Sequence, residues 1–177
     1  AFAYSDLTSV VIPDGTVIEE GVFSECASLK TVVIGSNVTI GKFAFSLNKD
    51  EAFKVLSYNE DGEKYFYYEF HSPLQSLTIG DNVVIGENAF ANAADLESVT
   101  LGAGAKIEKM AFYNCSSLSA IYLEPNTPPT IKRGVGGIDP FENLPLDYTL
   151  YVPTSSYSKY SSDSDWSRYL EHMKKYN

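Results

Sequence analysis

The side chains best suited to chemistry in this 177-residue chain are two cysteines and two histidines. A nucleophilic catalytic group needs a histidine held beside it by an orienting partner, and a zinc site needs a cluster of Cys and His ligands. Cys26 and Cys115 lie far apart in the sequence, and His71 and His172 have no such partners near them. We therefore expect no catalytic residue, no metal site and no cofactor.

Three weaker motifs also fall short of a site. Residues 134–137 (GVGG) lack the strand and helix that flank a phosphate-binding loop, and residues 59–63 (NEDGE) lack the spacing of a calcium loop. We interpret both segments as turns or loops. Asn37 and Asn114 begin formal glycosylation sequons, but both fall in repeated positions of the chain, and we attach no function to them.

The chain is acidic, with 23 Asp and Glu against 13 Lys and Arg and a net charge of −10. Phosphate backbones and anionic membrane surfaces repel such a chain, so we expect no nucleic-acid partner. Uninterrupted apolar runs are only a few residues long, so we expect no membrane insertion. The chain opens inside a repeated motif without an initiator Met or a signal peptide, which favours a fragment or a processed form.

The elements that must position these residues repeat about every 22 residues. Phenylalanines mark the period, with spacings of 21, 22, 45, 22 and 29 residues along Phe2, Phe23, Phe45, Phe90, Phe112 and Phe141. The spacing of 45 is one period plus a 23-residue insertion. Other columns keep the same phase: Leu29, Leu74, Leu96, Leu118; Val10, Val32, Leu77, Val99, Ile121, Leu150; Ile12, Ile34, Ile79, Leu101, Leu123, Val152; Ile18, Ile40, Ile85, Ile107; and Val22, Ala44, Ala89, Ala111.

Each repeat is predicted to form one coil of a solenoid. The pattern Leu-x-x-Val-x-Ile ends in period-two alternation, which is typical of a short strand with one buried face. Glycine follows three of these strands, at positions 35, 80 and 102, where the chain must turn. Residues 89–96 (AFANAADL) are typical of a turn of helix. Because one coil buries too little apolar surface to fold alone, the coils must stack in parallel and share a core.

The pattern L-x-x-V-x-I…I-x-x-x-A-F-x-x-C, carried by residues 29–45 and 96–115, resembles the BspA-like leucine-rich-repeat family of bacterial and some protist surface proteins. Residues 149–153 (TLYVP) and the aromatic residues after them are similar to the closing cap of that family. The resemblance implies a right-handed leucine-rich-repeat solenoid, β-rich, with stacked short parallel strands, helical turns and a C-terminal helical cap. It also implies an extracellular, cell-surface location and non-catalytic binding, but it brings no defined site residues.

We predict a single leucine-rich-repeat domain over residues 1–177, with about six coils over 1–153, a β-hairpin insertion at 48–72 and a C-terminal cap at 154–177. In the cap, Ser161 or Ser162 is expected to begin a helix, whose stripe of Trp166, Tyr169, Leu170 and Met173 would lie on the last coil. No equivalent N-terminal cap is recognisable. Either more coils precede this end or it pairs with something else.

The insertion has two strand-like segments, residues 51–58 and 63–70, with the turn at 59–62. It is rich in aromatic residues, which leaves two interpretations. One face of the hairpin packs back on the solenoid, because an isolated two-stranded hairpin needs support. Alternatively its aromatic residues, Tyr65 and Tyr67 among them, contact a ligand.

Cys26 and Cys115 occupy the same column, three coils apart. At about 4.8 Å per stacked strand they would lie roughly 14 Å from each other. A disulfide needs less than about 7 Å between the Cα atoms. We therefore predict two separate, buried, reduced thiols that act as small apolar groups.

The strand residues that alternate with the core columns should face outward in two rows: Ser9, Thr31, Ser76, Ser98, Ala120, Thr149; and Val11, Val33, Thr78, Thr100, Tyr122, Tyr151. Leucine-rich solenoids commonly bind through such a face, and aromatic residues carry much interface energy. Candidate ligand contacts are Tyr122, Tyr151, Thr31, Thr78 and Thr100, together with Tyr65 and Tyr67 of the insertion. The alternative is a solvated face of residues with good strand propensity.

These patterns leave three functional hypotheses. The first is a non-catalytic adhesion or protein-interaction module that binds a protein on a host or neighbouring cell surface. The second is a carbohydrate-binding module that takes a glycan, as the tyrosine content and acidic surface suggest. The third is a structural spacer within a larger surface protein, which would bind no ligand.

Overall fold

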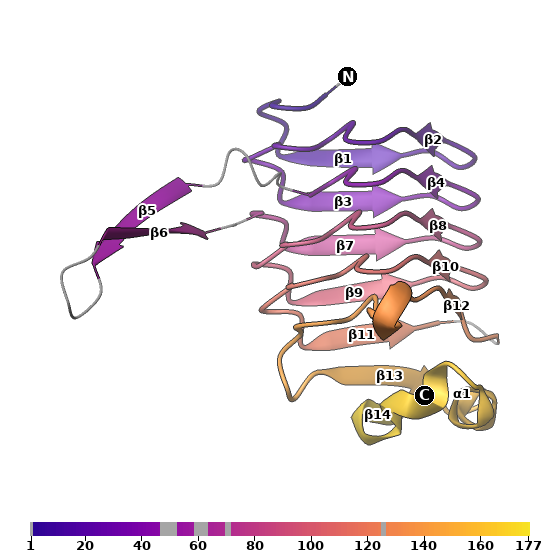
Figure 1. The fold of residues 1–177 in the computed structure, drawn as a ribbon. Coiled ribbons are helices and arrows are strands. Elements are labelled where there is room, and N and C mark those ends of the chain that lie inside the picture. Colours follow the sequence, from indigo (N-terminus) through magenta and orange to yellow (C-terminus); the bar gives the residue numbers. More distant parts are fainter. Residues whose placement is uncertain (1, 47–52, 59–63, 70–71, 125–126) are drawn as a thin grey trace.

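A computed structural model describes residues 2–46, 72–124 and 127–177 in full, and the backbone alone of residues 53–58 and 64–69. The chain winds into a solenoid of about six turns, each lying directly over the one before it (Figure 1). This is the stacked, parallel, β-rich architecture that the 22-residue period predicts.

A seven-stranded parallel sheet runs the length of the stack, in the order β1-β3-β7-β9-β11-β13-β14. Its register aligns equivalent residues of successive coils, so that Val10 lies beside Val32 and Val32 beside Leu77. The strands are β1 (Ser9–Ile12), β3 (Thr31–Ile34), β7 (Ser76–Ile79), β9 (Ser98–Leu101), β11 (Ala120–Leu123), β13 (Thr149–Pro153) and β14 (Met173–Tyr176).

A second parallel sheet is formed by the short apolar pairs that follow each turn, in the order β12-β10-β8-β4-β2. It stacks the isoleucine column, and Ile131, absent from the predicted column, pairs with Ile107 and extends it by one coil. The strands are β2 (Val17–Ile18), β4 (Thr39–Ile40), β8 (Val84–Ile85), β10 (Lys106–Ile107) and β12 (Thr130–Ile131).

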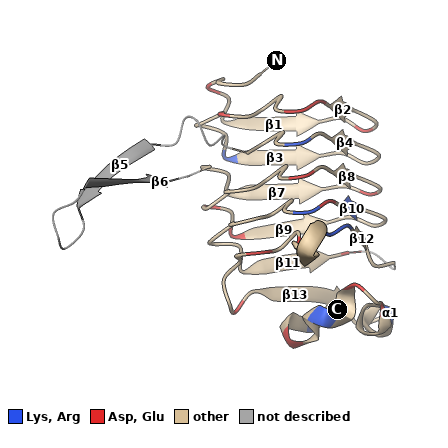
Figure 2. Ribbon diagram, viewed as in Figure 1, with Lys and Arg blue, Asp and Glu red and all other residues tan. Residues whose placement is uncertain are grey.

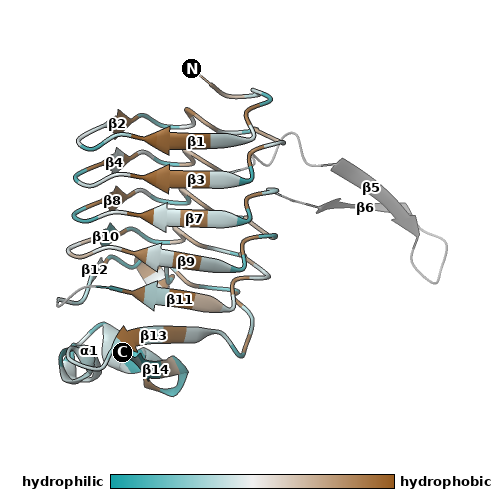
Figure 3. Ribbon diagram, turned by 180° about the vertical axis from the view of Figure 1, so that it is seen from behind, coloured by the Kyte–Doolittle hydropathy of each residue, from teal (hydrophilic) through white to brown (hydrophobic). Residues whose placement is uncertain are grey.

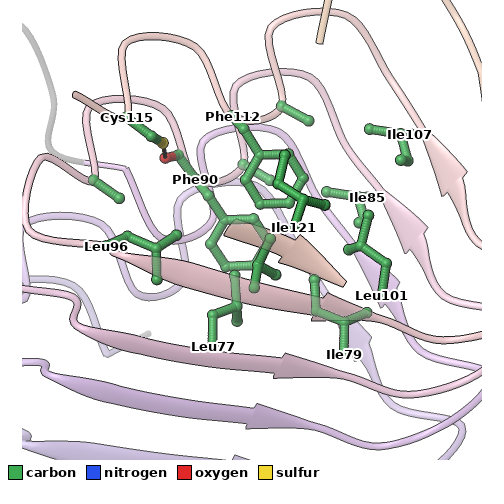
Figure 4. Close-up of a cluster of buried hydrophobic side chains, with 14 of the residues drawn as sticks. Leu77, Ile79, Ile85, Phe90, Leu96, Leu101, Ile107, Phe112, Cys115 and Ile121 are labelled. Carbon is green, nitrogen blue, oxygen red and sulfur yellow. Dashed lines mark hydrogen bonds between the residues drawn. The ribbon is translucent and has the colours of Figure 1, made fainter. Parts of the chain in front are cut away.

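The core between the two sheets is built around a ladder of phenylalanine rings (Figure 4). The six rings stack nearly parallel, with centroids separated by 5.3, 5.0, 5.2, 5.5 and 5.8 Å along Phe2, Phe23, Phe45, Phe90, Phe112 and Phe141. The Phe anchors from Phe23 to Phe141 thus occupy one equivalent buried position in successive coils, and Phe2 ends the ladder partly exposed. This shared position is the feature on which the solenoid prediction depends.

Glycines allow neighbouring coils to approach closely just after the strands of the seven-stranded sheet. A Cβ atom built on Gly80 would lie 2.7 Å from the carbonyl carbon of Gly35, and one on Gly102 would lie 2.4 Å from that of Gly80. Any side chain at these positions would push neighbouring coils apart. The glycines that the sequence marks as turn residues are therefore required by close stacking.

The predicted helical turn at residues 89–96 is wrong, because this segment forms a series of hydrogen-bonded turns. Asn88 and Asn92 adopt positive φ angles of 55° and 64°, which interrupt any helix after four residues. The backbone N–H groups of Phe90 and Asn92 donate to carbonyls of the next coil, those of Ala111 and Tyr113. Pairing between coils thus replaces the hydrogen bonds that a helix would make.

The C-terminal segment covers the last coil, but with a different arrangement from the single helix that the apolar stripe predicts. It contains α1 (Tyr157–Ser162), the 3₁₀ helix η2 (Trp166–His172) and strand β14, which pairs in parallel with β13. Ser161 and Ser162 end α1 instead of beginning a helix. Trp166 and Tyr169 are buried as expected, whereas Leu170 is 43% exposed and Met173 is buried from a strand.

Polar contacts fasten this cap to the final loop of the solenoid. The indole Nε1 of Trp166 donates to the carbonyl of Pro129 at 2.7 Å. The guanidinium of Arg133 donates through Nε to Asp139 at 3.3 Å and through Nη1 to Asp165. The hydroxyl of Tyr169 donates to the same Asp139 carboxylate at 2.6 Å, so one cation and one phenol share it.

The insertion contains two antiparallel strands, β5 (Phe53–Tyr58) and β6 (Lys64–Glu69), within the two segments expected to be strands. They extend away from the stacked coils (Figure 1). The expected turn at residues 59–62 lies outside the described residues. The side chains of the hairpin are also outside the description, so the choice between packing and ligand contact stays a prediction.

Candidate interaction face

The outward face of the seven-stranded sheet presents a straight row of side chains, one from each coil. Strand pairing places these residues side by side in the order Val11, Val33, Thr78, Thr100, Tyr122, Tyr151 and Lys174. The row passes from valine through threonine to tyrosine, and β1 and β3 are more continuously hydrophobic than β7 and β9 (Figure 3). Period-two alternation alone predicted the first six members.

Of the candidate contacts, Thr78 lies exposed in this row and Thr100 is half-buried there. Thr31 is half-buried in the parallel row, beside Ser76. Thr149, expected to face outward in the same row as Thr31, is only 8% exposed. It lines a hollow beneath the cap together with His172, and this cover, invisible in a strand pattern, explains the wrong expectation.

The face carries no charge over most of its length. The first six strands of this sheet are β1, β3, β7, β9, β11 and β13, and they contain no Asp, Glu, Lys or Arg. The charged residues gather on the turns at either side (Figure 2). Lys174 and Lys175 of β14 are the first charged residues in the sheet. An uncharged surface of this extent contrasts with the net charge of −10 on the whole chain.

A cluster of three tyrosines occupies the C-terminal end of the face. The rings of Tyr122 and Tyr151 stack with centroids 4.7 Å apart and planes 11° from parallel. Tyr176 meets Tyr122 perpendicularly, at 6.2 Å and 89°. All three side chains are half-buried. The structure thus brings together the two predicted tyrosines and adds a third.

Tyr176 is the residue of this cluster that sequence reasoning missed. It lies on β14, a segment that the apolar spacing assigned to a helix. The segment Met173–Tyr176 reads Met-Lys-Lys-Tyr, and no period-two alternation of apolar and polar residues marks it as a strand. Tyr65 and Tyr67 lie on β6, and their side chains fall outside the described part of the chain.

The rim at the carboxyl ends of the strands is acidic. Asp14 accepts a hydrogen bond from the backbone N–H of Ser36 at 2.7 Å, and Asp81 accepts one from Ala103 at 2.7 Å, so both carboxylates also brace the next coil. Glu124 follows β11 at the same rim and is exposed. Burial, and secondly the charge of Glu124, raise the pKa of the Tyr176 phenol.

The two thiols are free and buried, as predicted. Each donates to the carbonyl of a Phe-ladder residue one coil earlier, Cys26 to Phe2 at 3.2 Å and Cys115 to Phe90 at 3.3 Å. Burial raises the pKa of Cys115 to about 12. A thiol held in its protonated form is a poor nucleophile, so Cys115 contributes packing to the column.

The other chemical candidates have structural surroundings of their own. His172 stacks on Tyr148 at 4.0 Å, and its Nδ1 lies 3.1 Å from the Tyr148 carbonyl oxygen. Residues 134–137 form a loop that includes the 3₁₀ turn η1 (Val135–Gly137). Asn37 is exposed, whereas Asn114 donates to the side chain of Asn92 at 3.0 Å. The possible calcium-loop residues, 59–63, lie outside the described residues.

Two features bear on metals and membranes. Among the residues that the structure describes, no three His, Cys, Asp or Glu side chains are grouped so that they could hold a metal ion. Within the same residues, no helix has the length and apolar character needed to span a bilayer. The expectation that the chain has no catalytic role stays a prediction.

Comparison with known proteins agrees with the architecture. The family model for the BspA type leucine rich repeat region matches residues 1–119 in six copies. No individual curated protein matches the chain. The matched span includes β1, β3, β7 and β9 of the long sheet. The chain therefore belongs to the BspA-type leucine-rich-repeat family.

Proposed function

We propose that the chain is a non-catalytic interaction module that binds another protein through the outward face of its seven-stranded sheet. The observation that carries this proposal is the uncharged character of that face in a chain of net charge −10. Charged side chains resist the desolvation that docking requires, and the centres of protein interfaces are depleted in them.

The tyrosine cluster gives the face a centre of binding. Tyrosine is enriched among the few residues that dominate interface energy, because a large ring buries much area with little loss of side-chain freedom. Tyr122 and Tyr151 are already stacked in the free protein, so docking orders little that is not ordered beforehand.

A cell-surface setting suits this function. BspA-type repeats are typically surface-associated and often mediate interactions. The partner that we propose is therefore a protein on a host or neighbouring cell surface, and the activity is adhesion. The extracellular location of this chain is part of the proposal.

The carbohydrate-binding alternative has less support from the geometry. Sugar rings pack on aromatic faces, but Tyr122 and Tyr151 turn a face toward each other and Tyr176 crowds the edge of the pair. The two ring faces that stack on each other are therefore closed to a sugar. The spacer alternative leaves the uncharged face without a role.

The test is binding to arrays of purified extracellular-matrix proteins and of glycans, with the wild type and a Tyr122→Ala/Tyr151→Ala variant. We expect a matrix-protein signal that the double variant weakens at least about tenfold. Tyr4→Ala is the matched control, since Tyr4 is an exposed tyrosine in the first coil, away from the cluster. Signals confined to glycans would support the alternative, and binding that ignores both tyrosines would refute the proposed face.

A further inference from the structure

The strand that carries Tyr122 ends at an exposed carboxylate, that of Glu124, which no cation of the described residues pairs with. Glu124 lies two residues after Tyr122 and thus projects from the same side of the chain. Its backbone N–H donates to the carbonyl of Leu101 at 3.1 Å, so the pairing of β11 with β9 continues to Glu124, at the end of the strand that carries Tyr122. Among residues 2–46, 72–124 and 127–177, no Lys, Arg or His forms an ion pair with Glu124.

This combination of groups favours a cation. The face of an aromatic ring carries negative potential, and an ammonium or guanidinium group over it is attracted electrostatically. A carboxylate at the edge of the cluster adds a direct charge interaction and accepts hydrogen bonds from the same cation. Guanidinium suits the site better than ammonium, because it is planar, weakly hydrated and able to stack on a ring while it donates sideways.

The surrounding charges define where the cation would sit. Lys174 is paired in register with Tyr151, so the protein's own positive charge lies on the C-terminal side of the cluster. Its side chain lines the hollow that Asp147 and Glu171 also border. The Tyr122 side has Glu124 and, farther along the same rim, Asp81. The field therefore directs a cation toward Tyr122 and Glu124.

We propose that Tyr122, Tyr151, Tyr176 and Glu124 form a receptor for one cationic side chain of the partner protein, arginine in preference to lysine. This inference rests on the proposed function, since the partner docks on the outward face. It goes further by stating the chemistry that the partner must present at the centre of its contact surface.

The test uses N-acetyl-arginine amide as the probe and N-acetyl-citrulline amide as its neutral analogue of the same shape. We expect arginine amide to shift the ring-proton NMR signals of the three tyrosines with a dissociation constant on the order of millimolar. We expect citrulline amide to shift them about tenfold less, and lysine amide to fall between the two. Added salt should weaken the arginine effect.

Glu124→Gln removes the charge while keeping the side chain's size, and it should weaken arginine-amide binding about threefold to tenfold. The matched control is Glu97→Gln, an exposed carboxylate at the amino end of β9 on the opposite rim, which should leave binding unchanged. Unaltered thermal unfolding of both variants would show that the fold is intact. Equal shifts with arginine and citrulline, or equal effects of the two substitutions, would overturn the proposal.

Failure here can be told apart from failure of the proposed function. If a matrix-protein partner loses binding with Tyr122→Ala/Tyr151→Ala but is indifferent to Glu124→Gln, the face is a protein interface and the cation receptor is wrong. If arginine amide binds as expected while every matrix-protein signal ignores the tyrosines, the cluster binds a guanidinium group but the proposed protein docking on this face is wrong.

Discussion

The first and last coils of the solenoid differ in how their outer sides are covered. At the C-terminal end, the ring of Phe141 meets Trp166 and Tyr169 at 6.1 and 5.9 Å, and β14 covers the edge of β13. At the other end, Phe2 closes the ladder with a side chain 52% exposed, and β1 is the outermost strand of its sheet. Within the described residues, the column of rings is thus covered by the cap at one end, and its ring at the other end is half in solvent.

This difference shows that the repeat alone does not cover its own core. Each coil covers the ring of its neighbour, so the last ring must be covered by sequence that departs from the repeat. Trp166, Tyr169 and β14 do this at the C-terminal end, and the two lysines of β14 also make that sheet edge a poor template for further strands. Val11, 72% exposed on β1, gives no such protection.

The largest effect should come from removing most of the C-terminal cap. Deleting residues 161–177 takes away Trp166, Tyr169 and β14, which exposes Phe141 and the edge of β13. We expect aggregation, or a fall of more than about 5 kcal/mol in the free energy of unfolding, measured by urea denaturation and light scattering. Removal of Asn177 alone is the control. An unchanged melting curve after the long deletion would show that the cap is dispensable.

The phenylalanine ladder could be predicted well from the sequence, because its residues recur at a regular spacing. The outward direction of Tyr122 and Tyr151 could be predicted for the same reason, since alternation in a strand with one buried face fixes both sides at once. Prediction from the sequence failed in the C-terminal cap, where the repeat stops. Trp166, Tyr169 and Met173 fit one helical spacing, but Met173 belongs to a strand.

The helical turn expected at residues 89–96 failed for a different physical reason. The local sequence is rich in alanine, which favours a helix, but Asn88 and Asn92 take left-handed conformations that asparagine tolerates. Hydrogen bonds to the next coil reward that geometry, and they depend on a neighbour that local propensity does not include. Tyr176 escaped prediction for a related reason, since its place in the cluster depends on how β14 pairs.

A pair of substitutions along the ladder sharpens the comparison. Phe112→Ala removes a fully buried ring with a stacked neighbour on each side, at 5.5 and 5.8 Å, and should cost about 3–5 kcal/mol of unfolding free energy. Phe2→Ala removes a ring that stacks on Phe23 and is half in solvent, and should cost about 1 kcal/mol or less. Chemical denaturation of both variants measures the difference. Similar costs would mean that the open end is covered in solution.

The smallest expected loss of stability comes from breaking the polar contacts that hold the cap on the last loop. Arg133→Met keeps much of the apolar stem but removes the hydrogen bonds to Asp139 and Asp165, which join the last loop to the cap. Because the Arg133 side chain is only 16% exposed, solvent replaces these contacts poorly, and we expect a loss of about 1–3 kcal/mol in urea denaturation.

Lys132→Met is the matched control for this anchor. Lys132 is the preceding residue and pairs with Glu108 at 3.0 Å, but its side chain is 72% exposed, so the pair should contribute less than about 1 kcal/mol. Hydrogen exchange adds a second readout, because a loosened cap should raise exchange in β14 and β13 before it does so in β7. If the two variants lose the same stability, or if exchange rises evenly along the sheet, the Arg133 contacts do not fasten the cap, and the aromatic packing of Trp166 and Tyr169 alone closes that end.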